Sequence, residues 1–273
     1  MQNGPYIRDR ILPATISALC TRTATDFRAF SDNWVLRLEK NRQVRWVVGY
    51  KFDVNDSAAG QLAQDKVATY MVLAAAGVPA IEHYLVRSVP HEPMQWHINL
   101  PNLEGVAVVV KPLDGTGGRA VERYESITMA LDAVHSSGEP AWAISPHYDL
   151  QAEYRMVMLD GQVLLAFSKT NPTMRGRLRL FNLGYGAAAA DISDTDLLGR
   201  LTSIAVKTTQ ALALRLAAVD IVCTAAGELR VLEVNDGISL EHYAEQSAEY
   251  KQRAVDVYEK IVAAMFAEKP YTK

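Results

Sequence analysis

Two acidic residues inside apolar segments constrain the fold of this 273-residue chain more than any other sequence feature. Asp220 and Glu233 each stand between two aliphatic residues, in the segments 218–224 and 228–234. Segments of this composition favour β-strands. A two-residue turn at Ala226-Gly227 would join them into a hairpin in which Asp220 lies directly opposite Glu233.

Carboxylates that face each other on one side of a hairpin repel, and apolar surroundings raise the cost of keeping both charged. A cation bound between Asp220 and Glu233 would remove this cost. Asn235 lies two residues beyond Glu233 and therefore shares its face. Two carboxylates and one amide oxygen are ligands that suit Mg²⁺ or Mn²⁺. The hairpin therefore predicts a metal site, unless one carboxylate points to solvent.

A glycine-rich loop follows the apolar segment 106–110, which predicts a buried strand. Lys111 ends this strand, and the loop after it contains Gly115, Thr116, Gly117 and Gly118. Glycines allow backbone N–H groups to approach phosphates closely. The loop is not a Walker A motif, because no Lys-Ser or Lys-Thr pair follows the glycines. It predicts a flap over phosphates, and the alternative is an ordinary turn beside a solvated lysine.

Lys66 is a second candidate cation. On a helix predicted over residues 57–76, it shares a face with Leu62, Tyr70 and Leu73. Its ammonium group would either reach past this face to solvent or serve as a second cation for a triphosphate.

The remaining segments predict a mixed α+β protein with antiparallel hairpins. Helices are expected over residues 57–76, 127–135, 194–216 and 244–267. Strands besides the late hairpin are expected over 34–38, 44–49, 81–86, 106–110, 120–124, 141–145, 153–159 and 162–168. Loops are expected over 88–104 and over the basic segment 169–186.

The composition excludes several classes of protein. Apolar residues make up 49% and charged residues 22%, which is typical of a globular chain rather than a disordered one. The net charge of −3 argues against a nucleic-acid partner. Two cysteines, Cys20 and Cys223, cannot form a disulfide framework. Neither a signal peptide nor a membrane span is predicted, so we expect a cytoplasmic protein without a membrane partner.

A lysine on a helix, a lysine before a glycine flap and a late Asp…Glu-x-Asn hairpin, in this order, resemble the ATP-grasp superfamily over residues 50–265. The sequence LEVNDGISLE at 232–241 is similar to the end motif of the glutathione synthetase and ribosomal-protein glutamate ligase branch. Residues 65–80 also resemble that branch. The resemblance implies an ATP-grasp fold, with two α+β subdomains clamping ATP over residues 56–273 and a shortened N-terminal segment over residues 1–55.

The resemblance also implies roles for the candidate residues. The ATP phosphates would be held by Lys66 and Lys111, beneath the flap of Gly115, Thr116, Gly117 and Gly118. The adenine and ribose would be held by the hinge residues Ser145, Pro146, His147 and Tyr148 and by Glu153. The residues near the transferring phosphoryl group would be Arg155, Lys169, Arg179 and Asn182. Two Mg²⁺ or Mn²⁺ ions would be held by Asp220, Glu233 and Asn235.

Three positions depart from the family pattern. Ser145-Pro146-His147 stands where relatives usually carry Gln-Glu, and Pro146 has no N–H to offer adenine. Arg179 lies one residue away from the family's arginine, and Tyr185 occupies a position that is often arginine. All three lie where the nucleotide or the acceptor would be recognised, so the substrates do not follow from the resemblance.

The implied activity is that of an ATP-dependent carboxylate–amine ligase that releases ADP and forms an amide or peptide bond through an acyl phosphate. Its partners would be small-molecule or peptide acids and amines, and a homo-oligomer is left open. The alternatives are a phosphotransferase (kinase) of the same fold and a non-catalytic ATP-binding module. A nicotinamide enzyme is a further alternative, because residues 115–120 match the loose pattern G-x-G-x-x-A.

Overall fold

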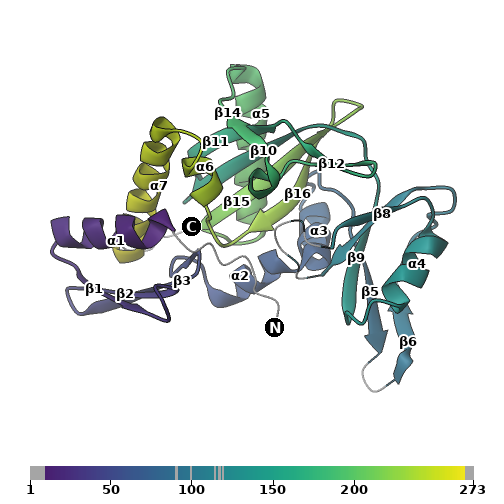
Figure 1. The fold of residues 1–273 in the computed structure, drawn as a ribbon, viewed down its shortest axis with the longest axis horizontal. Coiled ribbons are helices and arrows are strands. Elements are labelled where there is room, and N and C mark those ends of the chain that lie inside the picture. Colours follow the sequence, from purple (N-terminus) through teal and green to yellow (C-terminus); the bar gives the residue numbers. More distant parts are fainter. Residues whose placement is uncertain are drawn as a thin grey trace.

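The structure is a computed structural model that describes residues 10–89, 92–98, 100–113, 115, 118 and 120–267, with the backbone alone at 88, 89 and 92–98. Helices and antiparallel sheets are mixed along the described chain, which confirms the predicted α+β class (Figure 1). A central sheet lies between a second sheet near one end of the molecule and a small N-terminal sheet near the other.

The central sheet has five antiparallel strands. In spatial order they are β14 (Ala188–Ala190), β11 (Gln162–Thr170), β10 (Leu150–Leu159), β15 (Leu216–Thr224) and β16 (Leu229–Asn235). The helices that pack against it are α3 (Lys66–Ala75), α5 (Thr195–Ala211) and α7 (Ala248–Phe266).

The two faces of this sheet have different neighbours, because successive side chains of a strand point to opposite sides. Val219 points to the face that α3 and α5 cover. On the other face, Val157 and Ala218 pack in the cluster that contains α7. Further along the same strands, Arg155 and Asp220 share that face but line a cavity. One face of the sheet therefore has an apolar half that packs and a charged half that lines the candidate site.

The second five-stranded sheet carries the glycine loop. In spatial order its strands are β6 (Glu92–Ile98), β5 (Tyr84–Val89), β9 (Ala141–Pro146), β7 (Val108–Pro112) and β8 (Glu122–Tyr124). Helix α4 (Ile127–His135) covers it, and Val110, Val134 and Trp142 belong to the apolar cluster between them.

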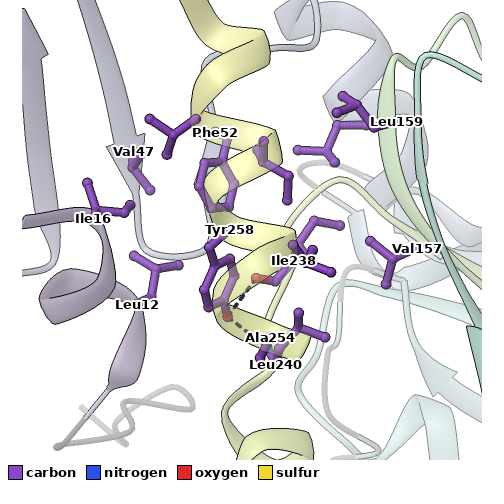
Figure 2. Packing of buried hydrophobic residues seen from close by; sticks show 14 of the residues in the cluster. Leu12, Ile16, Val47, Phe52, Val157, Leu159, Ile238, Leu240, Ala254 and Tyr258 are labelled. Atoms are coloured by element: carbon purple, nitrogen blue, oxygen red, sulfur yellow. Dashed lines mark hydrogen bonds between the residues drawn. The ribbon is translucent and has the colours of Figure 1, made fainter. Parts of the chain in front are cut away.

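The N-terminal segment forms a helix and a four-stranded sheet. These elements are α1 (Ile11–Arg22), β1 (Asp26–Phe30), β2 (Val35–Lys40), β3 (Gln43–Val48) and β4 (Lys51–Phe52). Figure 2 shows Tyr258 of α7 between Leu12 and Phe52 on one side and Ile238 on the other. The carboxylate of Glu241 accepts a hydrogen bond from the backbone N–H of Ile11 at 2.7 Å. The domain boundary at residue 55 stays a prediction, and the residues on its two sides share this core.

Several predicted boundaries are wrong. The helix expected over 57–76 is broken into α2 (Ser57–Gln64) and α3, because Asp65 has an extended backbone and its carboxylate caps α3. The loop expected over 88–104 contains β6, and the N-terminal α1 and β1 were not predicted. The helix expected up to residue 216 ends at Ala211, since β15 begins at Leu216. The loop expected over 169–186 contains β12 (Thr173–Arg175), β13 (Leu178–Leu180) and the short 3-10 helix η1 (Leu183–Tyr185).

The hairpin of β15 and β16 has the predicted pair but not the predicted turn. Asp220 lies opposite Glu233, as expected. The backbone N–H of Thr224 donates to the carbonyl of Glu228 at 2.9 Å, so the turn contains three residues instead of two. A bulge then leaves Leu232 without a cross-strand partner and shifts the register back by one residue. Two deviations of opposite sign therefore restore the predicted pair.

Within the described residues, every helix is too short or too polar to span a lipid bilayer. Both Cys20 and Cys223 carry free thiols.

Candidate active site

A cavity of about 740 Å³ lies between residues of the central sheet and residues of the second sheet. Every predicted site residue that the structure describes lines this cavity. These residues are Lys66, Lys111, Gly115, Gly118, Ser145, Pro146, His147, Tyr148, Glu153, Arg155, Lys169, Arg179, Asn182, Asp220, Glu233 and Asn235. Thr116 and Gly117 lie outside the described residues.

Opposite charges alternate across the central sheet at the base of the cavity. Register places Glu153 opposite Lys169, Arg155 opposite Asp220, and Asp220 opposite Glu233. The guanidinium of Arg155 donates to both oxygens of Asp220, at 2.8 and 2.7 Å. The ammonium of Lys169 donates to Glu153 and, at 3.0 Å, to Asp220. The repulsion that the sequence predicts between the hairpin carboxylates is therefore relieved on the Asp220 side by two protein cations.

This network sets the charge states at the base of the cavity. Burial acts to raise the pKa of Asp220, but the positive charges of Arg155 and Lys169 prevail and lower it to about 2. Burial raises the pKa of Glu153 above its usual value, with Lys169 acting in the opposite direction. Asp220 therefore stays a carboxylate at neutral pH.

The two candidate lysines come from other elements and are both buried. Lys66 begins α3, and its ammonium donates to the carbonyl of Leu113 at 3.2 Å and to that of Gly115 at 2.6 Å. It therefore holds the start of the glycine loop and does not extend to solvent. Burial lowers the pKa of Lys111 to about 8, although the nearby charge of Glu233 acts to raise it.

Whether the predicted metal site fits depends on the donors that remain available. A carboxylate has about four acceptor positions, and Asp220 uses three of them. The side chains of Glu233 and Asn235 line the cavity and form no hydrogen bond with another described residue. Two oxygen groups and part of a third are thus available, which fits a divalent cation that takes further ligands from water or phosphates.

No cluster of three or more His, Cys, Asp or Glu side chains suited to a metal occurs among the described residues. A metal at this site would therefore depend on the amide oxygen of Asn235 as its third protein ligand. Metal binding stays a prediction.

The hinge between β9 and β10 narrows the choice of hydrogen-bond donors for a base. Pro146 has no N–H, and the N–H of His147 donates to the carbonyl of Ala107 at 2.8 Å. Tyr148 is anchored from the far side: its hydroxyl donates to Glu82 at 2.7 Å, and Arg230 donates to the other oxygen of Glu82 at 3.0 Å.

The basic segment 169–186 reaches the flap and the hinge. Arg175 donates to the carbonyl of Gly118 at 3.2 Å, and Arg179 donates to that of Leu150 at 3.0 Å. The side-chain oxygen of Asn182 accepts from the N–H of Gly184 at 2.8 Å and so caps η1.

The sequence interpretation missed part of the cavity wall. Its missed residues include Trp34, Val48, Tyr50 and Lys51 of the N-terminal segment and Ser239, His242 and Tyr243 after β16. Position alone could have indicated the last three, because they follow Asn235 closely. No local sequence signal indicates the first four, since only long-range packing brings them to the cavity.

Two antiparallel α+β units with a cavity between them, and with lysines and carboxylates converging on it, define the ATP-grasp class of fold. The chain belongs to an ATP-grasp domain family, the third family of its clade, whose model matches residues 97–261. The predicted resemblance to the ATP-grasp superfamily is thereby confirmed.

Individual relatives agree with this assignment. A probable alpha-L-glutamate ligase of Klebsiella pneumoniae (strain 342) is 29% identical over 196 residues, which are 70% of this chain and 61% of the relative. The chain thus spans less than two thirds of that protein's length.

Solved structures share the fold. The D-alanine–D-alanine ligase of Bacillus anthracis in complex with ATP matches with a TM-score of 0.57 and 17% identity, over 77% of this chain and 70% of that one. The D-cycloserine synthetase DcsG matches with a TM-score of 0.52 and 22% identity, over 74% and 71% of the two chains.

Proposed function

We propose that this chain is an ATP-dependent carboxylate–amine ligase that releases ADP. One observation carries the proposal: cations from separate elements converge on one cavity with a row of carboxylates at its base. Lys111 comes from the second sheet, whereas Arg155 and Lys169 come from the central sheet. Phosphoryl transfer depends mainly on positioning and on neutralising charge on the phosphoryl oxygens. The ligase names of the Klebsiella relative and of the structural neighbours support the same class.

The proposed reaction has two steps. A carboxylate oxygen of the acid substrate attacks the γ-phosphorus, the bond to ADP breaks, and an acyl phosphate forms. The amine nitrogen then attacks the acyl carbon, the carbon–oxygen bond to phosphate breaks, and the amine loses a proton as the amide forms. Neither step needs a protein nucleophile, so the side chains act by holding reactants close and in line.

The proposed roles follow the location of each side chain. Lys66 and Lys111 hold the phosphates, and Lys66 also fixes the glycine loop above them. Arg155 and Lys169 face the transferring phosphoryl group. Arg179 and Asn182 border it from the basic segment.

The nucleotide and metal roles complete the proposal. The hinge at 145–148 receives adenine, with Tyr148 next in line for a backbone donor, and Glu153 lies near the ribose. Glu233 and Asn235, with the remaining position on Asp220, would hold Mg²⁺ or Mn²⁺. When bound, such ions neutralise charge on the phosphoryl oxygens.

The test is a screen for ADP release. The protein is mixed with ATP, Mg²⁺ and pairs of amino acids and small carboxylic acids, and the products are read by mass spectrometry. A ligase gives ADP, phosphate and a product whose mass is that of acid plus amine minus water. A phosphorylated product without an amide would indicate a kinase instead. ATP binding without ADP release across the panel would indicate a binding module.

A further inference from the structure

The cavity continues beyond the residues assigned to ATP. Asn235 is followed by Asp236 and Gly237, and Gly237 forms a β-bridge with Lys51. The N–H of Ile238 donates to the carbonyl of Tyr50 at 2.8 Å. These contacts bring the N-terminal sheet to the end of β16, away from the second sheet that carries Lys111 (Figure 1).

The wall at this end is aromatic and firmly held. The Trp34 and Tyr50 rings meet edge to face, with centroids 6.2 Å apart. The guanidinium of Arg10 lies 4.9 Å from the Trp34 ring and 5.1 Å from the Tyr50 ring, and it donates to the carbonyls of Gly49 and Asn33. Such cation–π contacts stabilise ring positions. Arg10 itself does not line the cavity, so it supports the rings from behind and orders them before any substrate binds.

The charges that line this end of the cavity cancel. Lys51 and Asp236 form an ion pair of 2.9 Å, and His242 contacts Glu245 at 3.0 Å. Burial raises the pKa of Tyr50 to about 12, so its phenol is neutral at physiological pH. Among the described residues that line this end, no cation remains for a second substrate carboxylate.

We propose that Trp34, Val48 and Tyr50 form a specificity subsite for an apolar or aromatic group of the acid substrate. This inference rests on the proposed function: the reacting carboxylate would lie at the γ-phosphate beside Glu233 and Asn235, and the rest of the acid would extend toward Tyr50. Val48, which is 46% exposed, forms the rim. A ring or branched alkyl group would displace water from the Trp34 and Val48 surfaces. A second carboxylate would lose hydration there without gaining a partner.

The test measures acid binding separately from turnover. Isothermal titration in the presence of Mg²⁺ and a non-hydrolysable ATP analogue compares 3-phenylpropanoate, which ends in a ring, with glutarate, which ends in a second carboxylate. We expect 3-phenylpropanoate to bind at least about tenfold more tightly, the effect of burying roughly one large apolar group. Trp34→Ala should remove about tenfold of this affinity and leave glutarate binding and the Kd of the ATP analogue unchanged, and Trp34→Phe should restore most of the loss.

Trp46 provides the matched control. It lies on β3 of the same sheet, is 41% exposed and does not line the cavity. Trp46→Ala should leave both acids unaffected. If Trp34→Ala fails to fold, Val48→Asp places a charge at the rim without disturbing the buried packing and should weaken 3-phenylpropanoate binding alone.

Two results would overturn the subsite: glutarate binding as tightly as 3-phenylpropanoate, or Trp46→Ala weakening binding as much as Trp34→Ala. Failure of the ligase proposal would look different. Trp34-dependent acid binding without ADP release for any acid–amine pair would keep the subsite and reject the ligase. ADP release with doubly charged acids alone would keep the ligase and reject the subsite.

Discussion

Arg155 and Asp220 face each other across β10 and β15, and the arginine guanidinium donates to both oxygens of the buried aspartate. This fork holds one carboxylate of the β15–β16 hairpin in a fixed orientation. It leaves Glu233, on the other side of Asp220, to face the cavity. The strand pairing therefore separates two acidic residues that look equivalent in the sequence: one is held by protein cations and the other is available to ligands.

Replacing Arg155 with methionine should lower the free energy of unfolding at pH 7 by about 3 kcal/mol. Removing one member of a buried ion pair leaves an uncompensated charge, which is more costly than never having had the pair. Urea denaturation of the wild type and Arg155→Met measures the difference. The double variant Arg155→Met/Asp220→Asn should recover part of the loss, because the amide needs no counter-ion. A double variant less stable than Arg155→Met would contradict this account.

The comparison of sequence and structure shows which parts of the site local patterns predict. Strand alternation brought Asp220, Glu233 and Asn235 to one face even though the turn was wrong, because the Leu232 bulge compensated for the longer turn. Lys66 was placed on the correct face although the helix was not expected to break at Asp65. Period-two and period-3.6 patterns survive small errors in boundaries, since they depend on relative spacing.

Contacts between distant segments were not predictable in this way. Glu82 and Arg230 are 148 residues apart, and nothing local to either residue indicates the other. The metal interpretation was incomplete for the same reason, because the cations that neutralise Asp220 come from β10 and β11. The Trp34 wall likewise depends on N-terminal packing against α7, which no short motif encodes.

The affinity for ATP should fall as the pH rises from 7 to 9. Burial lowers the pKa of Lys111 to about 8, from an ordinary value of 10.5. Below pH 8 the ammonium is charged and can hold a phosphate, whereas above pH 8 it becomes neutral, so the affinity should fall up to about tenfold per pH unit. Titration calorimetry at several pH values measures this.

Lys111→Gln is the control for that pH dependence. Its ATP affinity should be lower and nearly flat over the same range. The free wild-type protein should also gain stability between pH 8 and 10.5, because the unfolded chain then binds more protons at this lysine than the folded one. A wild-type affinity that is flat from pH 7 to 9 would exclude Lys111 as a phosphate ligand.

Glu233→Gln should reduce ADP release by at least about 100-fold, as expected when a group that neutralises developing charge is lost. Its stability should not fall, because the Glu233 side chain forms no hydrogen bond with another described residue and stands opposite another carboxylate. Steady-state ADP release and urea denaturation give the two readouts. Glu228→Gln, in the same hairpin and largely exposed, should change neither. Near-normal turnover by Glu233→Gln would remove this residue from the metal assignment.

Glu82→Gln should weaken ATP binding by about threefold to tenfold. Glu82 accepts hydrogen bonds from the Tyr148 hydroxyl at 2.7 Å and from Arg230 at 3.0 Å, and so fixes the tyrosine that borders the hinge. Hydrogen bonds to a charged group contribute about 1.5–3 kcal/mol each. Titration calorimetry with ATP measures the effect. Glu228 is the other carboxylate bound by Arg230, and an equal loss in Glu228→Gln would show that Arg230 alone, rather than the link to Tyr148, matters.

Gly49→Ala should destabilise the protein more than Gly105→Ala, although both glycines have left-handed backbones, with φ of +60° and +72°. Each substitution carries a backbone cost of about 1 kcal/mol. At Gly49 a Cβ atom would also lie 2.6 Å from a ring carbon of Trp34, whereas at Gly105 it would meet nothing within 4 Å. Overpacking of this kind adds about 1–3 kcal/mol. Urea denaturation of both variants isolates the steric part, and the double variant Gly49→Ala/Trp34→Ala should be less destabilised than the sum of its single changes, because removing the ring removes the clash. Equal losses at the two glycines would mean that Trp34 moves freely, which would contradict an aromatic wall fixed against Gly49.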